Sequence, residues 1–223
     1  MAANPAGPRI TYYDDATGER IELSTATLAN WAAKTANLLR DELGAGPGSR
    51  VAVLLPAHWQ TAAVLFGGWW IGSEVVLAGE PADIALCTAD RLDEADAAAG
   101  MGEIAVLSLD PFGKPVPDLP VGLTDYATSV RVHGDQIVQE RNPGAALDDR
   151  SVADVLAAAR ASASVQGLTA ADRIMSTAGW ETADDLIDHL LALYVVGASL
   201  VQVANPDPVL LDRRRETEKS TRG

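Results

Sequence analysis

The chain has 223 residues, 48% of them hydrophobic and 22% charged, which is the composition of a folded globular protein and excludes a disordered chain. It carries 31 Asp and Glu residues against 17 Lys and Arg, a net charge of −14, and a surface this acidic would repel a phosphate backbone. We therefore expect no nucleic-acid partner. A single cysteine, Cys87, excludes an intramolecular disulfide and a cysteine-based zinc site, and no metal site is predicted.

Two apolar stretches need comparison with membrane helices. Residues 61–79 are interrupted by Gly72-Ser73-Glu74, and residues 190–204 are too short to cross a bilayer as a helix. Both are interpreted as buried parts of a globular fold, so no membrane partner is expected. The chain begins MAANPAGPR, without the apolar segment of a secretory signal, which predicts a cytoplasmic protein.

The predicted elements of the first 108 residues alternate between strands and helices. Turn residues around Gly18 indicate an opening hairpin over residues 10–23, and apolar spacing predicts a helix from residue 25 to 43. The apolar run RVAVLL at 50–55 is typical of a strand buried on both faces of a parallel sheet. Further helices are expected near 58–71 and 90–99, and further strands at 74–78, 83–87 and 103–107. This alternation predicts an α/β fold with doubly wound, mostly parallel sheets flanked by helices.

The second half of the chain begins with a change in composition. Residues 109–124 contain four prolines and two glycines and are predicted to be a linker. An irregular β hairpin is expected at 125–140, helices at 151–166 and 181–196, strands at 172–177 and 199–203, and a short helix at 207–217. The expected organisation is a first α/β subdomain with the N-terminal hairpin (1–108), the linker (109–124), a second α/β part (125–212) and a flexible basic tail (213–223).

Three stretches resemble, in order and spacing, the N-terminal half of the adenylate-forming superfamily of acyl-CoA synthetases, luciferases and adenylation domains. Residues 10–79, with SRVAVLLP and VVLAG, resemble the family's opening elements, and DIALCTADRLDEADAA resembles its next strand and helix. Residues 150–201, with DRIMS and GASLV, resemble the segment after the family's phosphate loop. The resemblance implies the fold of the N-terminal part of acyl-CoA synthetases, in a small actinobacterial-type relative.

The phosphate loop is where the chain departs from this family. The family's loop reads [ST]SG[ST]TGxPK, in which glycines let backbone N–H groups approach phosphates and a lysine adds charge. At the corresponding place, residues 126–136, this chain reads YATSVRVHGDQ, with valines where the loop needs glycine and with Asp135, which would oppose a triphosphate. The family's later adenine, ribose and hinge motifs and its C-terminal lysine have no counterpart. The resemblance thus implies lost catalysis, with no catalytic residue and no cofactor.

The turn after the predicted strand 172–177 is the candidate binding site. Ligands of open parallel sheets bind beyond the carboxyl ends of the strands, and in the family the matching turn borders the acyl and nucleotide pocket. A vestigial cofactor-binding pocket would be formed there by Ser176, Thr177, Trp180 and Glu181. The alternative interpretation is a plain helix cap by Thr177 or Glu181.

Three functions remain open from the sequence. The main hypothesis is a truncated, non-catalytic AMP-binding-enzyme-like domain that acts as a binding or interaction module, with a homo-oligomer or a protein partner over the face left bare by the missing half. The alternative is a small-molecule or nucleotide-binding enzyme, acyl/AMP ligase-like, that uses a rewired phosphate loop at 126–136 and the residues 176–181. The third is a regulator that docks on a full-length synthetase through its basic tail.

Overall fold

A computed structural model describes residues 5–77 and 79–223, and its contacts divide the chain into two compact units. Unit 1 comprises Met1–Leu28, Ala57–Trp59 and Ala153–Gly223, and unit 2 comprises Ala29–Pro56 and Gln60–Val152. Two expectations fall partly outside the described residues, namely the start of the chain at residues 1–4 and the end of the strand expected at 74–78. The predicted domain borders at residues 108 and 125 stay a prediction.

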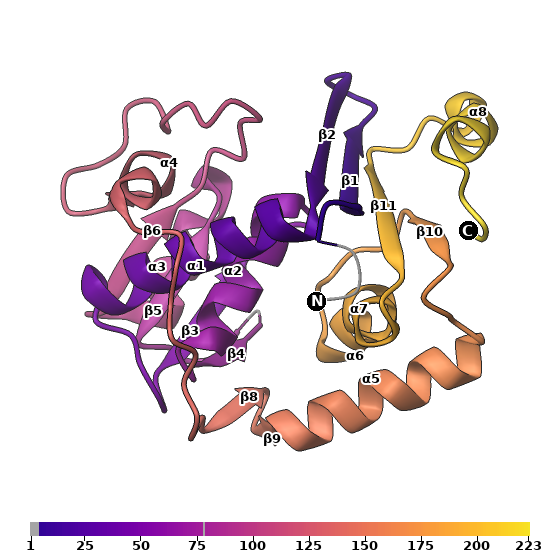
Figure 1. Ribbon diagram of the computed structural model, residues 1–223. Helices are drawn as coiled ribbons and strands as arrows, with labels where there is room; N and C mark the ends of the chain where they lie inside the picture. Colours follow the sequence, from indigo (N-terminus) through magenta and orange to yellow (C-terminus); the bar gives the residue numbers. More distant parts are fainter. Residues whose placement is uncertain (1–4, 78) are drawn as a thin grey trace. The chain divides into compact units, whose positions relative to one another are not determined.

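Unit 2 is built on a seven-stranded sheet in the order β7-β6-β5-β3-β4-β8-β9 (Figure 1). Neighbouring strands are parallel except for the antiparallel pair of β8 and β9. The central strand β3, Arg50–Leu54, buries its last four residues, as expected of a strand covered on both faces. The other strands are β4 (Glu74–Val76), β5 (Ile84–Cys87), β6 (Glu103–Val106), β7 (Thr124–Asp125), β8 (Ala145–Leu147) and β9 (Arg150–Ser151).

The helices of unit 2 confirm the predicted alternation of strand and helix. They are α1 (Thr25–Asp41, whose first turn belongs to unit 1), α2 (Trp59–Trp70), α3 (Leu92–Ala99) and the short α4 (Tyr126–Ser129). Helices α1 and α2 approach closely at Gly67, where an added Cβ would lie 2.9 Å from the carbonyl oxygen of Ala32. Any side chain larger than hydrogen at this position would therefore push the two helices apart.

Unit 1 is built on a four-stranded sheet in the order β10-β11-β1-β2. Strand β1 (Pro8–Asp14) lies between its neighbours, antiparallel to β2 (Glu19–Ser24) and parallel to β11 (Ser199–Ala204). The predicted opening hairpin is thereby confirmed. Strand β10 (Arg173–Ser176) is parallel to β11 and forms the other edge of the sheet. The doubly wound α/β architecture expected from the sequence is the observed one.

The helices of unit 1 are α5 (Val152–Gln166), α6 (Ala183–Leu186), α7 (Ala192–Val196) and α8 (Pro208–Glu218). A π-helical turn, Ile187–Leu191, joins α6 to α7, so the helix predicted at 181–196 is one helical segment with a widened turn in its middle. Gly197 ends this segment in the left-handed conformation, with a φ of 91°.

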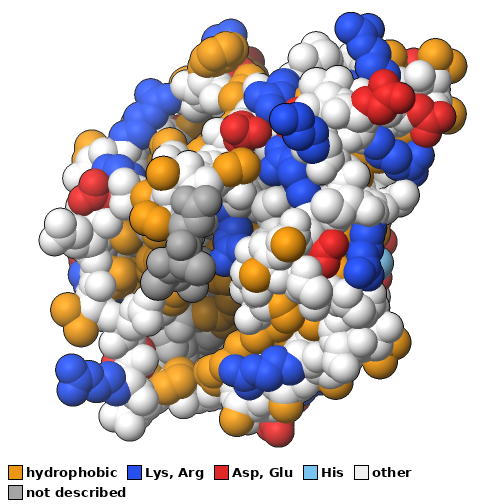
Figure 2. Space-filling view, turned by 45° about the vertical axis from the view of Figure 1, so that its right-hand side comes forward, with side chains coloured by type: hydrophobic (Ala, Val, Ile, Leu, Met, Phe, Trp, Pro, Cys, Tyr) orange, Lys and Arg blue, Asp and Glu red, His pale blue; other side chains and the backbone are white. Residues whose placement is uncertain are grey.

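The last residues, expected to be a flexible basic tail from residue 213 on, form the end of α8 and a stretch bonded to β10. The backbone N–H of Thr221 donates to the carbonyl oxygen of Arg173 at 2.8 Å, and that of Met175 donates to the carbonyl oxygen of Arg222 at 3.0 Å. The upper right of Figure 2, where Figure 1 places α8, carries Lys and Arg side chains together with Asp and Glu side chains. The basic residues of this segment therefore lie among acidic ones.

One buried carboxylate attaches α8 to the sheet of unit 1. Glu218, the last residue of α8, is 7% exposed. It accepts hydrogen bonds from the Tyr13 hydroxyl at 2.5 Å, from Arg20 Nη2 at 2.9 Å and from Arg173 Nη2 at 2.5 Å. Since the three donors come from β1, β2 and β10, this carboxylate connects the helix to three strands.

The substitution Glu218→Gln is expected to lower the free energy of unfolding by about 1–3 kcal/mol, because a neutral amide leaves two guanidinium groups without their shared carboxylate. Urea unfolding followed by circular dichroism measures the difference. The control is Glu216→Gln on the exposed side of the same helix, which should change the stability by less than about 0.5 kcal/mol. Equal effects of the two substitutions would contradict the anchoring role of Glu218.

The same carboxylate makes the stability depend on acid pH. Burial raises the pKa of Glu218, but the hydrogen bonds from Tyr13, Arg173 and Arg20 outweigh burial and hold the pKa below its ordinary value. A carboxyl group of this kind stabilises the fold above its ordinary pKa of about 4.3, and the contribution is lost as the pH falls through the lowered value. The stability difference between the wild type and Glu218→Gln should therefore be constant near neutral pH and shrink below about pH 4.

Candidate functional site

The four residues predicted to form a pocket lie in one turn of unit 1, at the carboxyl end of β10. Ser176 is the last residue of β10, Thr177 is exposed, and Trp180 and Glu181 precede α6. The carboxyl edge of a parallel sheet is where such folds bind ligands. The structure places the four residues together at this edge, and their role in binding stays a prediction.

The turn is supported by two buried side chains with unused hydrogen-bonding atoms. Trp180 is 2% exposed and Gln202, in β11, is 1% exposed. Gln202 Nε2 donates to the carbonyl oxygen of Ala178 at 2.9 Å, and Ser176 Oγ accepts from the N–H of Ala178 at 3.1 Å. Within the described residues, neither Trp180 Nε1 nor Gln202 Oε1 has a hydrogen-bond partner. A buried donor and a buried acceptor at this edge are atoms that a bound molecule or a water could satisfy.

Gln202 is the residue of this turn that the sequence analysis missed. It pairs with Ser176 in the parallel register of β10 and β11, which places it next to the end of β10. The signal that could have found it is an amide side chain inside the otherwise apolar strand SLVQVA. A polar residue in such a strand is retained only where it is hydrogen-bonded or functional.

Thr177 and Glu181 do not cap the following helix, so the alternative interpretation of these two residues is wrong. The cap is Thr182, whose Oγ1 accepts from the N–H of Asp185 at 3.1 Å, while Asp185 Oδ2 accepts from the N–H of Thr182 at 2.9 Å. This reciprocal pair is a capping box, and the T-x-x-D pattern at 182–185 could have predicted it. Glu181 is left exposed beside Gly179.

The segment 126–136 begins as a helix in unit 2, so the irregular hairpin predicted at 125–140 is wrong. Helix α4 is continued by a 3-10 turn, Val130–Val132. Tyr126, Ala127 and Val130 form the buried side of this helical segment. Asp125 caps it by accepting from the N–H of Thr128 at 2.7 Å. The alternation of apolar and polar residues that indicated a strand is overridden by this cap and by burial of one helical face.

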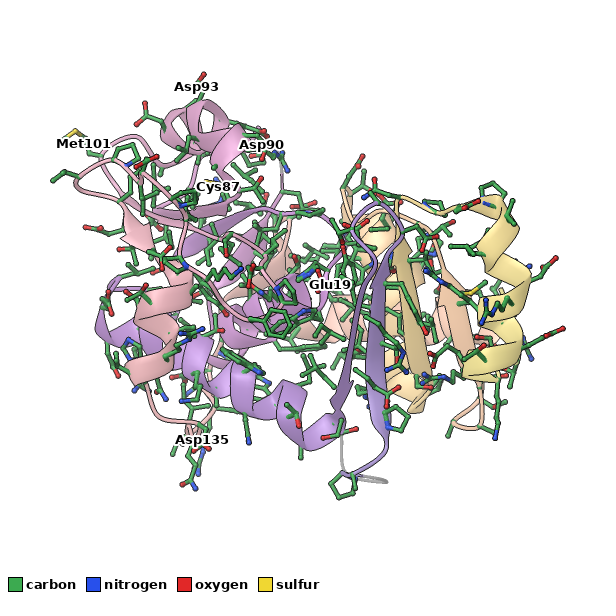
Figure 3. The ribbon with its side chains drawn as sticks, turned by 90° about the horizontal axis from the view of Figure 1, so that it is seen from above. Glu19, Cys87, Asp90, Asp93, Met101 and Asp135 are labelled. Carbon is green, nitrogen blue, oxygen red and sulfur yellow. The ribbon has the colours of Figure 1, made fainter. Side chains whose placement is uncertain are left out.

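Helix α1 holds this segment through its side chains. Lys34 Nζ donates to the carbonyl oxygen of His133 at 2.6 Å, and Asn37 Nδ2 donates to those of Gly134 at 2.8 Å and Gln136 at 3.0 Å. Asp135, between these carbonyl groups, is exposed and points outward (Figure 3). The ammonium group of Lys34, which contacts residues 126–136, is therefore bound to a backbone carbonyl group.

A second tie to α1 is a buried hydroxyl pair. The hydroxyl groups of Tyr126 and Thr35 lie 2.7 Å apart, and burial raises the pKa of Tyr126 to about 12. Tyr126 is therefore a neutral phenol at physiological pH, which excludes it as a general base.

The loop before β8 also uses its own backbone N–H groups. Oε1 of Glu140 accepts from the N–H of Arg141 at 2.8 Å and from the N–H of Asn142 at 2.7 Å. Two successive N–H groups directed at one anionic oxygen form the arrangement with which loops bind phosphate. In this chain the carboxylate of the loop itself occupies the arrangement.

Metal binding, membrane insertion and thiol chemistry are the other functions to consider for residues 5–77 and 79–223. Within these ranges, no three or more His, Cys, Asp or Glu side chains are grouped to hold a metal ion, and no helix is long and apolar enough to cross a membrane. Cys87, labelled in Figure 3, lies at the end of β5, and burial raises its pKa to about 11. A protonated, buried thiol is a poor nucleophile.

The fold is that of the N-terminal half of an acyl-CoA synthetase. The Brucella canis acyl-CoA synthetase matches with a TM-score of 0.79 at 16% identity, over 99% of this chain and 44% of that chain. Apo MatB from Rhodopseudomonas palustris matches with 0.74 at 16% identity, over 99% and 46%, and the anthranilate CoA ligase AuaEII with 0.69 at 16%, over 90% and 42%. The chain thus spans less than half the length of these enzymes.

The family is shown by a sequence relative. No family model matches the sequence. The chain is 70% identical over 226 residues to the "TIGR03089 family protein" of Mycobacterium tuberculosis (strain ATCC 25618 / H37Rv), covering 100% of this chain and 93% of that one. It belongs to the TIGR03089 family, and the expected actinobacterial relationship is confirmed.

Two threonines of the turn provide a matched test of the capping box. Thr182→Ala is expected to lower the free energy of unfolding by about 1 kcal/mol, because it removes the hydrogen bond that Oγ1 accepts from the N–H of Asp185 and the one that Oγ1 donates to Asp185 Oδ2. Thr177→Ala, five residues earlier and exposed, should change it by less than about 0.5 kcal/mol. Chemical denaturation of the two variants measures both values, and a larger loss for Thr177→Ala would contradict the assignment of the cap.

Proposed function

We propose that this chain is a binding module with the fold of an acyl-CoA synthetase N-terminal half, and that it does not catalyse adenylyl transfer. The observation that carries the proposal is the use of backbone N–H groups by the chain's own carboxylates. Asp125 occupies the N–H of Thr128, and Glu140 occupies those of Arg141 and Asn142. Adenylyl transfer needs donors that are free to bind the phosphates of ATP.

The cations of this region support the same proposal. Arg131 Nη2 donates to the carbonyl oxygens of Phe112 at 2.9 Å and Gly113 at 2.6 Å, and Lys34 is bound by the carbonyl oxygen of His133. Asp135 adds an exposed negative charge to the same segment. A triphosphate would have to displace these contacts and approach a carboxylate, and both changes cost free energy.

Calorimetry with ATP·Mg²⁺ and with AMP tests the proposal. We expect no saturable heat at dissociation constants tighter than about 1 mM, and no ATP–pyrophosphate exchange with added carboxylic acids. Micromolar ATP binding together with exchange would overturn it.

A variant adds a test of the physical reason. Glu140→Ala frees the two N–H groups of Arg141 and Asn142 and removes a negative charge, so this variant should give measurable heat with ATP where the wild type gives none. The exposed Glu103→Ala, at the start of β6, removes the same charge without freeing these groups and should leave the heat unchanged. Equal responses of the two variants would show that the loop carboxylate has no special role.

A module of this kind acts through a partner, and we propose a second copy or another protein in that role. Support comes from large apolar side chains that are more than four-fifths exposed in one segment of unit 2, namely Phe112, Val121, Val132 and Val138. Light scattering over a range of concentrations separates the two cases. A strict monomer that captures no protein would contradict the proposal.

A second candidate function is a small-molecule-binding enzyme that uses the carboxyl edge of the unit 1 sheet. It is favoured by the buried and unpartnered Trp180 Nε1 and Gln202 Oε1, since such atoms concentrate at functional sites. The test is Trp180→Phe, which removes the N–H and keeps an aromatic ring. A ligand whose affinity falls in this variant, and which the chain turns over, would favour the enzyme.

A further inference from the structure

A cavity of about 510 Å³ lies at the amino edge of the unit 1 sheet, at the other end of the strands from the turn 177–181. Its walls are formed by the starts of β1, β10 and β11, the end of α7 and the residues that follow α8. The charged and aromatic side chains in these walls are Arg9, Asp172, Arg173, Lys219 and Tyr194. A volume of this size is typical of sites for small organic molecules.

Arg9 is a buried cation in the wall of this cavity. It is 6% exposed, its Nη1 donates to the carbonyl oxygen of Ala198 at 2.7 Å, and its guanidinium carbon lies 4.6 Å from the centroid of the Tyr194 ring. Among the described residues its side chain has no other acceptor and no carboxylate partner, and Nε is buried without a hydrogen bond. A guanidinium group has five N–H donors, so most of them are unused.

An uncompensated buried charge is costly, and a bound anion would remove the cost. Burial lowers the pKa of Arg9 from its ordinary value, because removal from water disfavours the charged form of the guanidinium group. A carboxylate or phosphate that pairs with a buried guanidinium group forms a strong, charge-assisted contact.

The other charges of the cavity are already balanced, with one exception. Asp172 accepts from the N–H and Oγ1 of Thr169 and from Oγ1 of Thr221, each at 2.8 Å, and lies 3.5 Å from Arg222. Arg173 is paired with the buried Glu218 at 2.5 Å. Lys219 is exposed and has no ion pair among the described residues. The uncompensated charge in the walls is therefore positive, and it comes from Arg9 and Lys219.

We propose that this cavity binds a small organic monocarboxylate, with its carboxylate on Arg9 and its apolar part against Tyr194, Val195 and Val196. The planar carboxylate matches the planar guanidinium group. An organic carboxylate is preferred over inorganic phosphate because phosphate has no apolar part to place against these side chains. The end of α7 supplies the apolar wall, since its last three side chains are half-buried and line the cavity.

Calorimetric titration of the full chain with benzoate, hexanoate, benzamide and inorganic phosphate tests this site. We expect saturable binding of at least one carboxylate, and binding of benzamide and phosphate weaker by about tenfold or more, because benzamide lacks the charge and phosphate lacks the apolar part. Arg9→Met should weaken carboxylate binding by about tenfold or more. Arg213→Met, on the exposed face of α8 and away from the cavity, should leave it unchanged.

A second variant keeps the test valid if Arg9→Met does not fold. Val196→Trp fills the cavity from its wall and leaves every charge in place, so it should abolish carboxylate binding while circular dichroism stays that of the wild type. The proposal is overturned if neither carboxylate binds the wild type, if benzamide or phosphate binds as tightly as benzoate, or if Val196→Trp binds the carboxylates normally. The nucleotide titrations of the proposed function are independent of these outcomes.

Discussion

The parallel pairing of β1 with β11 is the constraint on which unit 1 depends. It joins Ile10 to Leu200 and Tyr13 to Val203, and these side chains are buried. Closing so long a stretch of chain costs conformational entropy, which only a buried interface can offset. The pairing creates both edges of the sheet at once. The turn with Trp180 is fixed at the carboxyl edge and the cavity with Arg9 at the amino edge, so a substitution that loosened this ladder would change both together.

The acidic composition acts inside the fold as well as on its surface. Glu218 binds donors from three strands, Asp185 completes the capping box of α6, and Asp125 caps α4. Glu140 accepts hydrogen bonds from two backbone N–H groups of the loop before β8. Carboxylates thus satisfy N–H groups that would otherwise attract anions from solution. Arg9 is the contrary case, a buried donor group for which the described part of the chain supplies no carboxylate.

Local patterns predicted the regular elements, and distant contacts decided the rest. The run that became β3 is apolar after Arg50, the run that became β11 is apolar apart from Ser199 and Gln202, and α1 has a clear stripe ended by glycine, so length and periodicity sufficed for them. The hairpin predicted at 125–140 is wrong because the alternating residues of this segment suit a strand. The cap by Asp125 and the hydroxyl pair of Tyr126 with Thr35 stabilise a helix there instead. At the candidate site, Ser176 to Glu181 were located from the strand that precedes them. Gln202 and Arg9 were not, because their importance arises from neighbours far away in sequence.

The fold shared with acyl-CoA synthetases and the side chains of this chain lead to different expectations about chemistry. A parallel sheet offers its carboxyl edge to ligands whatever its sequence, and this edge is present here with two unsatisfied polar atoms. Which N–H groups and cations can bind phosphate depends on the sequence. In residues 125–142 such groups are bound by carboxylates and carbonyl oxygens of the chain itself. At 16% identity, the backbone can be retained while the charges on it are redistributed. The position of the free charge, on Arg9 and Lys219 at the amino edge, therefore says more about what this protein binds than the fold does.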